Sequence, residues 1–152
     1  MKKTIRTYLG LFGLLFALTA HAAGGFTPGQ KLSEAEVSEL GELVEYKIGK
    51  MRVKVMPSPY TSGDTTLLVN SRGIVGVSHN QVMVAQAKPD AQETIQHTQP
   101  RPVSVQHHKQ TGIIVATYSD FGQAVQALKA LQAAMPDAKA ALPMVFNQQV
   151  PQ

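Results

Sequence analysis

Histidine is the residue type in this sequence with the clearest capacity for metal chemistry. His107 and His108 are adjacent, and His79 and His97 precede them. Imidazole nitrogens are common zinc ligands, but neighbouring residues on a β-strand point to opposite faces, so the adjacent pair is poorly arranged to bind one ion. We therefore interpret these histidines as exposed loop residues and expect neither a metal nor another cofactor.

The sequence contains no motif with useful catalytic specificity. It has no nucleophile elbow, phosphate-binding loop or zinc-protease motif, and it has no cysteine, which excludes a disulfide framework and a thiolate zinc site. Asp120 is of the right type for a catalytic acid, but its position before a helical apolar stripe explains it as a helix N-cap. We expect a protein that is not an enzyme, with an unrecognised hydrolase as the alternative.

The first 24 residues have the organisation of a cleavable secretory signal peptide. Lys2, Lys3 and Arg6 give a basic start, an uncharged and largely apolar run covers 8–20, and small residues follow. The run is shorter than the ~20 apolar residues that a membrane-spanning helix requires. We predict cleavage after residue 22, 23 or 24 and export to the periplasm, or secretion together with a partner. A retained membrane anchor is the alternative.

Removal of this segment changes the charge of the chain. The full sequence has 14 Lys and Arg against 10 Asp and Glu, a formal net charge of +4. Without the three basic residues of the signal peptide, 11 basic and 10 acidic side chains remain, and they form no basic cluster. We therefore expect no nucleic-acid partner. The remaining length, about 128 residues, suits a single domain, which we place at 33–146.

The first half of the mature chain predicts one helix and several strands. Residues 25–32 are expected to form a flexible leader. Ser33 and Glu36 have the spacing of a capping box, and apolar residues at helical spacing then predict a helix over 34–48. The polar segment 88–102, which contains three prolines, is expected to be a loop or a long hairpin tip. Alternation and apolar runs predict strands over 51–56, 65–70, 74–78 and 81–87.

The last third of the chain predicts a strand, a capped helix and a second strand. The first strand covers 111–118 and pairs with one over 102–106. Asp120 is the predicted N-cap of a helix that ends at Pro136 and carries one apolar stripe, formed by Phe121, Val125, Leu128, Leu131 and Met135. A strand over 140–146 and an extended tail over 147–152 follow. Together the elements predict an α+β fold, with a mainly antiparallel sheet and two helices.

The strand over 111–118 lacks the alternation of a half-buried strand. Ile113, Ile114 and Val115 are consecutive, so both faces of this strand are apolar. Two helices are too few to cover both faces of such a sheet, and we expect one face to dock a partner. We assign to this docking sheet the residues Ile113, Ile114, Val115, Tyr118 and Phe146. The alternative is a two-layer sandwich in which the first group of strands covers the second.

Residues 111–152 resemble the second half of a subtilisin-type propeptide. The matching pieces are the strand over 111–118, the helix from Asp120 to Pro136, the strand over 141–146 and the tail. With its own signal peptide and no attached protease, the whole chain is similar to the external chaperones of kexin-like serine proteases, of which Aeromonas provides an example. Residues 31–106 have no clear counterpart in the first half of a propeptide.

The resemblance implies a ferredoxin-like C-terminal half and a propeptide that is supplied as a separate protein. Such a protein would bind a folding subtilisin- or kexin-like serine protease as a 1:1 heterodimer, assist its folding and inhibit it. The competing function, from another class, is a periplasmic ligand-binding or adhesion module without catalytic activity.

The tail has the character of an extended ligand. Pro151 fixes its own backbone near the extended range and biases Val150 in the same way. Protease clefts bind extended peptides by strand addition. We expect Gln149, Val150, Pro151 and Gln152 to occupy the partner's cleft as a product-like inhibitor, with Gln152 in the primary pocket. A disordered chain end is the alternative.

Overall fold

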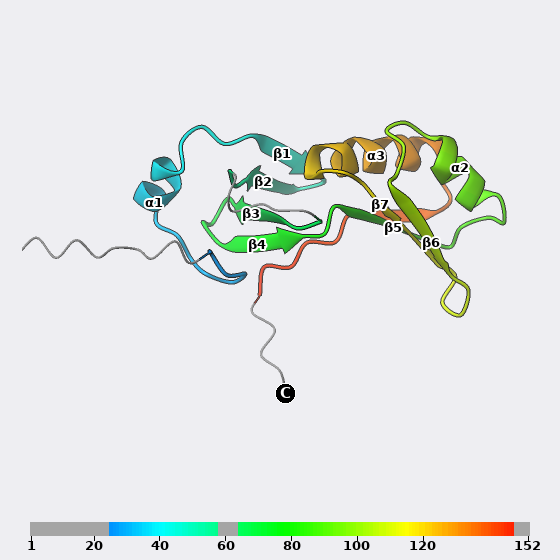
Figure 1. Ribbon diagram of the computed structural model, residues 1–152, viewed down its shortest axis with the longest axis horizontal. Coiled ribbons are helices and arrows are strands. Elements are labelled where there is room, and N and C mark those ends of the chain that lie inside the picture. The colour runs from blue at the N-terminus through cyan, green and yellow to red at the C-terminus, as the bar shows by residue number, and fades with distance from the viewer. Residues whose placement is uncertain (1–24, 58–63, 148–152) are drawn as a thin grey trace, which may run out of the picture.

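The described part of the chain folds into two four-stranded antiparallel sheets and three helices. The structure is a computed structural model that describes residues 25–57 and 64–147 (Figure 1). The strand orders are β1-β2-β3-β4 in the first sheet and β6-β7-β5-β8 in the second, and two of the helices have seven or more residues. The prediction of an α+β fold with mainly antiparallel strands is confirmed. The predicted signal peptide and the tail from 148 onward lie outside the described residues.

The first sheet is a meander of four consecutive strands. Its strands are β1 (Glu45–Ile48), β2 (Met51–Val55), β3 (Thr66–Asn70) and β4 (Val75–Ser78). Both faces of β3 are buried, because Leu68 belongs to the main core while Leu67 and Val69 belong to a second, smaller core. The strands predicted from 51 to 78 are therefore present, with ends that differ by a residue or so.

Helix α1 (Glu34–Glu39) is much shorter than the helix predicted over 34–48, and that prediction is wrong. The capping box at its start is as expected, with the Glu36 N–H donating to the Ser33 hydroxyl. The helix ends because Gly41 adopts a φ of 85°, in the left-handed region that favours glycine. Residues 45–48 instead form β1, which pairs with β2 through a turn at Gly49.

Residues 25–32 were expected to form a flexible leader, but they pack along β4. The Gly29 N–H donates to the Val75 carbonyl at 2.8 Å, and the Val75 N–H donates to the Gln30 carbonyl at 2.8 Å. Leu32 is buried in the second core together with Val69 and Val75. The expectation failed because an unpaired sheet edge provides backbone partners for a segment that has no secondary structure of its own.

The second sheet is built by the chain order β5-α2-β6-β7-α3-β8. Its elements are β5 (Gln81–Ala85), α2 (Ala91–His97), β6 (Ser104–His108), β7 (Ile113–Thr117), α3 (Phe121–Ala134) and β8 (Lys139–Ala141). The prediction of a loop over 88–102 is wrong, because this stretch contains α2. Ala91 and Ile95, four residues apart, are both buried and attach α2 to the main core.

Helix α3 begins and ends close to where the sequence predicts. The Asp120 carboxylate accepts a hydrogen bond from the Gln123 N–H at 2.8 Å, as expected of an N-cap. Phe121, Val125, Leu128 and Leu131 are buried. Helices α2 and α3 both lie on the upper side of the second sheet in Figure 1.

The two sheets share one core, although β4 leads directly into β5. Asn80, at the junction, adopts a φ of 55°, and its side-chain oxygen accepts a hydrogen bond from the buried Thr66 hydroxyl at 2.8 Å. Its carbonyl accepts from the Tyr118 N–H at 2.9 Å, which ties the junction to the end of β7. Val53 and Leu68 of the first sheet belong to the same core as α3. The described residues therefore form one domain.

The strand predicted over 140–146 is much shorter in the structure and covers Lys139–Ala141. β8 ends at Ala141, and the chain then crosses to the outer edge of β4. There the Val77 N–H donates to the Val145 carbonyl at 2.8 Å, and the Val145 N–H donates to the Val77 carbonyl at 2.9 Å. Pro143 has no N–H to continue the ladder with β5. We refer to residues 142–147 as the C-terminal strap.

Candidate partner-docking face

The second sheet has one covered face and one face without a covering layer. Register pairs Val82 with Ala116, Met83 with Val115, and Val84 with Ile114. Val82, Val84, Ile114 and Ala116 are at most 2% exposed and point toward the helices. In the described part of the chain, no helix or strand packs on the other side (Figure 1). We call this side the open face; its residues are Gln81, Met83, Ala85, Ser104, Gln106, His108, Ile113, Val115, Thr117, Lys139 and Ala141.

The open face has an apolar centre and a polar rim. Met83, Ile113 and Val115 are half-buried, and they line a shallow depression of about 490 Å³ together with the hairpin at 107–111. On one side of this centre, Gln81 Nε2 lies 3.4 Å from the Thr117 hydroxyl. The side chains that β6 contributes are polar. An apolar centre with a polar rim is the usual anatomy of a protein–protein interface.

The structure places only two of the five predicted docking residues on this face. Ile113 and Val115 lie there, whereas Ile114 and Tyr118 are each 2% exposed and fill the core beneath the helices. Burial raises the pKa of Tyr118 to about 12, as expected for a phenol that is removed from water. β7 therefore keeps its alternation of faces, even though residues on both faces are apolar.

Phe146 lies in the C-terminal strap and contacts the first sheet, away from the open face. Its ring packs directly over Gly76 of β4, and it contributes to the edge of the main core. It therefore serves the fold and does not belong to the open face. The predicted cleft-binding residues lie outside the described residues; they are Gln149, Val150, Pro151 and Gln152.

Met83 is a central residue of the open face that the sequence reasoning missed. Within β5 it alternates with Val82 and Val84, so the local pattern places it on the face opposite to those valines. Its position beside Val115 depends on the pairing of β5 with β7, across about thirty residues of chain. Alternation along β5 predicts the face on which Met83 lies, but it does not predict that Val115 is its cross-strand neighbour.

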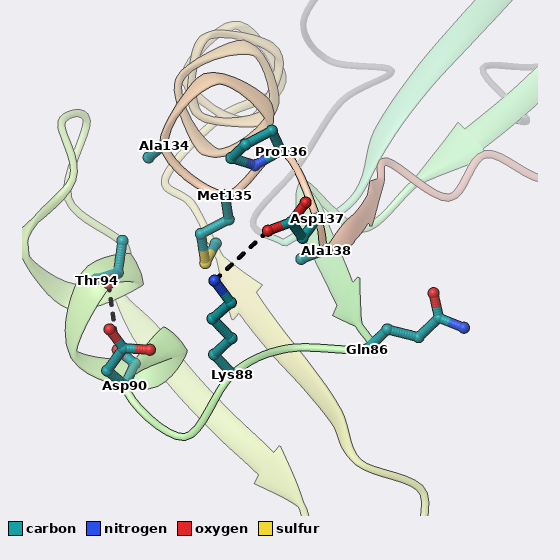
Figure 2. Close-up of a pocket in the computed structure, with 9 residues that line it drawn as sticks. All are labelled: Gln86, Lys88, Asp90, Thr94, Ala134, Met135, Pro136, Asp137 and Ala138. Atoms are coloured by element: carbon teal, nitrogen blue, oxygen red, sulfur yellow. Dashed lines mark hydrogen bonds and ion pairs between the residues drawn. The ribbon is translucent and has the colours of Figure 1, made fainter.

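A small polar pocket lies between the start of α2 and the connection from α3 to β8 (Figure 2). It encloses about 140 Å³. Lys88 and Asp137 form an ion pair across it at 3.5 Å, with side chains 73% and 79% exposed, and the Thr94 hydroxyl donates to the Asp90 carbonyl at 3.2 Å. Such an exposed pair contributes little stability, and the lining residues provide no nucleophile next to a base.

The histidines do not form a metal site in the described part of the chain. His107 and His108 occupy neighbouring positions of β6, where they pair with Ile114 and Ile113 respectively. Residues 25–57 and 64–147 contain no group of three or more His, Asp or Glu side chains that could hold a metal ion. The same residues contain no helix that is long and apolar enough to cross a membrane.

The open face and the end of the strap both lie away from helix α3. In Figure 1 the strap, coloured orange to red, ends below β4, on the side away from α3. The open face is also directed away from α3.

Comparison of the chain with protein-family models, with curated proteins and with solved structures found no match.

Proposed function

We propose that this protein is an exported chaperone of a secreted subtilisin- or kexin-like serine protease. It assists folding as a propeptide supplied in trans and inhibits the protease through its C-terminal tail. The observation that carries the proposal is the open face, which presents Met83, Ile113 and Val115, whereas α2 and α3 bury the opposite face of β5 and β7. Exposed apolar patches with a polar rim mark interaction sites.

The connection order of the second sheet supports this proposal. The order β5-α2-β6-β7-α3-β8 is the β-α-β-β-α-β order of a ferredoxin-like arrangement. The resemblance to subtilisin-type propeptides implies that arrangement, and the sequence provided a counterpart for its second half alone. We infer that β5, α2 and β6 correspond to that first half.

The position of the strap also supports the proposal. The strap ends below β4, away from α3 (Figure 1), and the open face is also directed away from α3. In the proposed complex, one partner covers the open face and receives the residues that follow Asn147.

A ligand-binding module is less well supported by the same geometry. Sites for small molecules are usually concave and enclose ~300–1,000 Å³. The pocket of Figure 2 is smaller, at about 140 Å³. A groove of about 920 Å³ between α1 and the first sheet is lined by charges of both signs, including Glu34, Arg52 and Lys54. Neither the pocket nor this groove combines an apolar lining with a few convergent polar groups. The depression on the open face, at about 490 Å³, is too shallow to enclose a small molecule.

The proposal is tested by co-expression with a kexin-like serine protease that lacks its own propeptide, such as that of Aeromonas. We expect a 1:1 complex in size-exclusion chromatography and active protease only when the chaperone is present during folding. Val115→Lys should abolish the complex, because it places an unpaired ammonium in the apolar centre of the interface.

Val103→Lys is the matched control for this experiment. Val103 is 70% exposed and precedes β6, and alternation from Ser104 places it on the helix side of the sheet. The Val103→Lys variant should therefore still form the complex. The proposed function is contradicted if the parent protein forms no complex, and the role of the open face is contradicted if Val115→Lys binds as well as Val103→Lys.

A further inference from the structure

The C-terminal strap is attached to both sheets. Leu142 is 6% exposed in the main core, and Met144 and Phe146 pack against the same core. Val145 exchanges two backbone hydrogen bonds with Val77 of β4, at 2.8 and 2.9 Å. The strap therefore leaves the second sheet at Ala141 and is held by the first sheet at its last described residues.

The strap packs on the first sheet at Gly76, where the Phe146 ring lies against the backbone. A Cβ atom at Gly76 would overlap atoms Cδ1 and Cε1 of the Phe146 ring and would lie 3.0 Å from its Cγ. The φ angle of Gly76 is not in the positive region, so the backbone does not require glycine at this position. The ring of Phe146 supplies the reason for glycine here.

The outer edge of β4 holds both ends of the described chain. Its Val75 pairs with residues 29–30, and its Val77 pairs with Val145. The first sheet thereby holds the strap at Val145 and Phe146. Five residues span at most ~17 Å when fully extended. The attachment of the strap to β4 therefore limits how far residues 148–152 can reach along a partner.

We propose that the first sheet is a positioning platform for the C-terminal tail, with Gly76 and Phe146 as its positioning residues. This inference rests on the proposed function, in which the tail enters the cleft of a serine protease. A tail held in the direction of the cleft loses less conformational entropy on binding than one attached by a free segment. The platform also gives a role to the sheet that has no counterpart in a subtilisin-type propeptide.

The first part of the test uses the isolated protein. Amide hydrogen exchange at Val77 and Val145 is compared in the parent, Gly76→Ala, Phe146→Ala and the double variant, with Val69→Ala as control. Val69 is buried in the second core. Its side chain lies on the face of the first sheet opposite to the face on which Phe146 covers Gly76. We expect faster exchange in Gly76→Ala than in Val69→Ala. In the Phe146→Ala background the added methyl has room, so Gly76→Ala should change exchange little further.

The second part measures complex formation and inhibition separately, with the Aeromonas kexin-like protease as the probe. Gly76→Ala and Phe146→Ala should retain the 1:1 complex through the open face, but inhibit about tenfold less tightly, the scale expected for losing one anchor of a preorganised segment. The double variant should inhibit no less tightly than Phe146→Ala, and Val69→Ala should inhibit like the parent.

The outcomes separate this inference from the proposed function. If Gly76→Ala loosens Val145 but inhibits like the parent, the platform is refuted while the chaperone proposal stands. Unchanged exchange at Val145 in both single variants refutes the anchor itself. If the parent neither binds nor inhibits the protease, the proposed function fails and the platform fails with it.

Discussion

Asp120 fixes the boundary between β7 and α3 with a single carboxylate. Its backbone is extended, and its Oδ1 accepts from the Gln123 N–H at 2.8 Å. Asp120→Ala leaves that N–H without its partner and should lower the free energy of unfolding by ~1 kcal/mol. Urea denaturation measures the change. Asp120→Asn, which keeps a capping oxygen, and Asp137→Ala, at an exposed carboxylate, should stay close to the parent; equal stability of Asp120→Ala and the parent would contradict the capping role.

Tyr118 makes stability depend on pH in the alkaline range. Burial raises its pKa from 10.0 to about 12. Between these values the unfolded chain loses the phenol proton while the folded protein keeps it, so the unfolded state is favoured as pH rises. The contribution of Tyr118 is therefore fully present below pH 10 and is lost toward pH 12. Tyr118→Phe should show a shallower decline of unfolding free energy over this range in denaturant titrations; identical slopes would show that Tyr118 ionises equally in both states.

Gly41 determines where α1 stops and allows β1 to form. Its φ of 85° is unfavourable for a residue with a Cβ, although the space around it is open. Gly41→Ala should therefore destabilise the protein by ~1 kcal/mol or more, through backbone strain alone. Gly25→Ala is the matched control, because its added methyl also meets no neighbour and its φ lies outside that region. Thermal unfolding of the two variants compares them, and the assignment fails if both melt at the same temperature.

The elements that the sequence predicted correctly are those with local signals. The capping box at Ser33 and the N-cap at Asp120 depend on residues three positions apart, and the stripe of α3 depends on spacings of three and four. The segment 45–48 has apolar residues that fit a helix as well as a strand. Its pairing with β2 makes this segment a strand, and no local sequence pattern predicts that pairing. Helix α2 was missed because two buried residues, Ala91 and Ile95, are too few to show a period.

The candidate site was predicted in part for the same reason. An apolar run at 113–115 indicates two apolar faces, which led to the prediction that β7 is a docking strand. The run does not indicate which face the helices cover, so Ile114 and Tyr118 were included although they are core residues. Met83 and the path of the strap follow from tertiary pairing with β7 and β4. These are properties of the assembled sheets.

At the scale of the whole molecule, α3 joins the two sheets. Phe121 at its start packs edge-on against Tyr46 of β1, with ring centroids 5.5 Å apart, and its later residues cover the second sheet. The main core therefore extends through both halves. The open face and the strap belong to one folded domain, so the proposed partner would meet both together. Contact at the open face and contact through the tail can then be separated by mutation.

Deletion of residues 150–152 tests whether the tail acts separately from the open face. The truncated protein keeps the strap and the open face, so we expect it to form the 1:1 complex with the kexin-like protease while losing most of its inhibition. Val115→Lys should lose both, because without docking the tail has no raised effective concentration at the cleft. Replacement of 150–152 by Gly-Ser-Gly controls for length and should behave like the deletion, since it removes the restricted backbone of Pro151 and the side chains that fill the subsites. Protease activity titrated against each form, with complex formation followed separately, decides between these outcomes; equal inhibition by the truncated and full-length proteins would place the tail outside the active site.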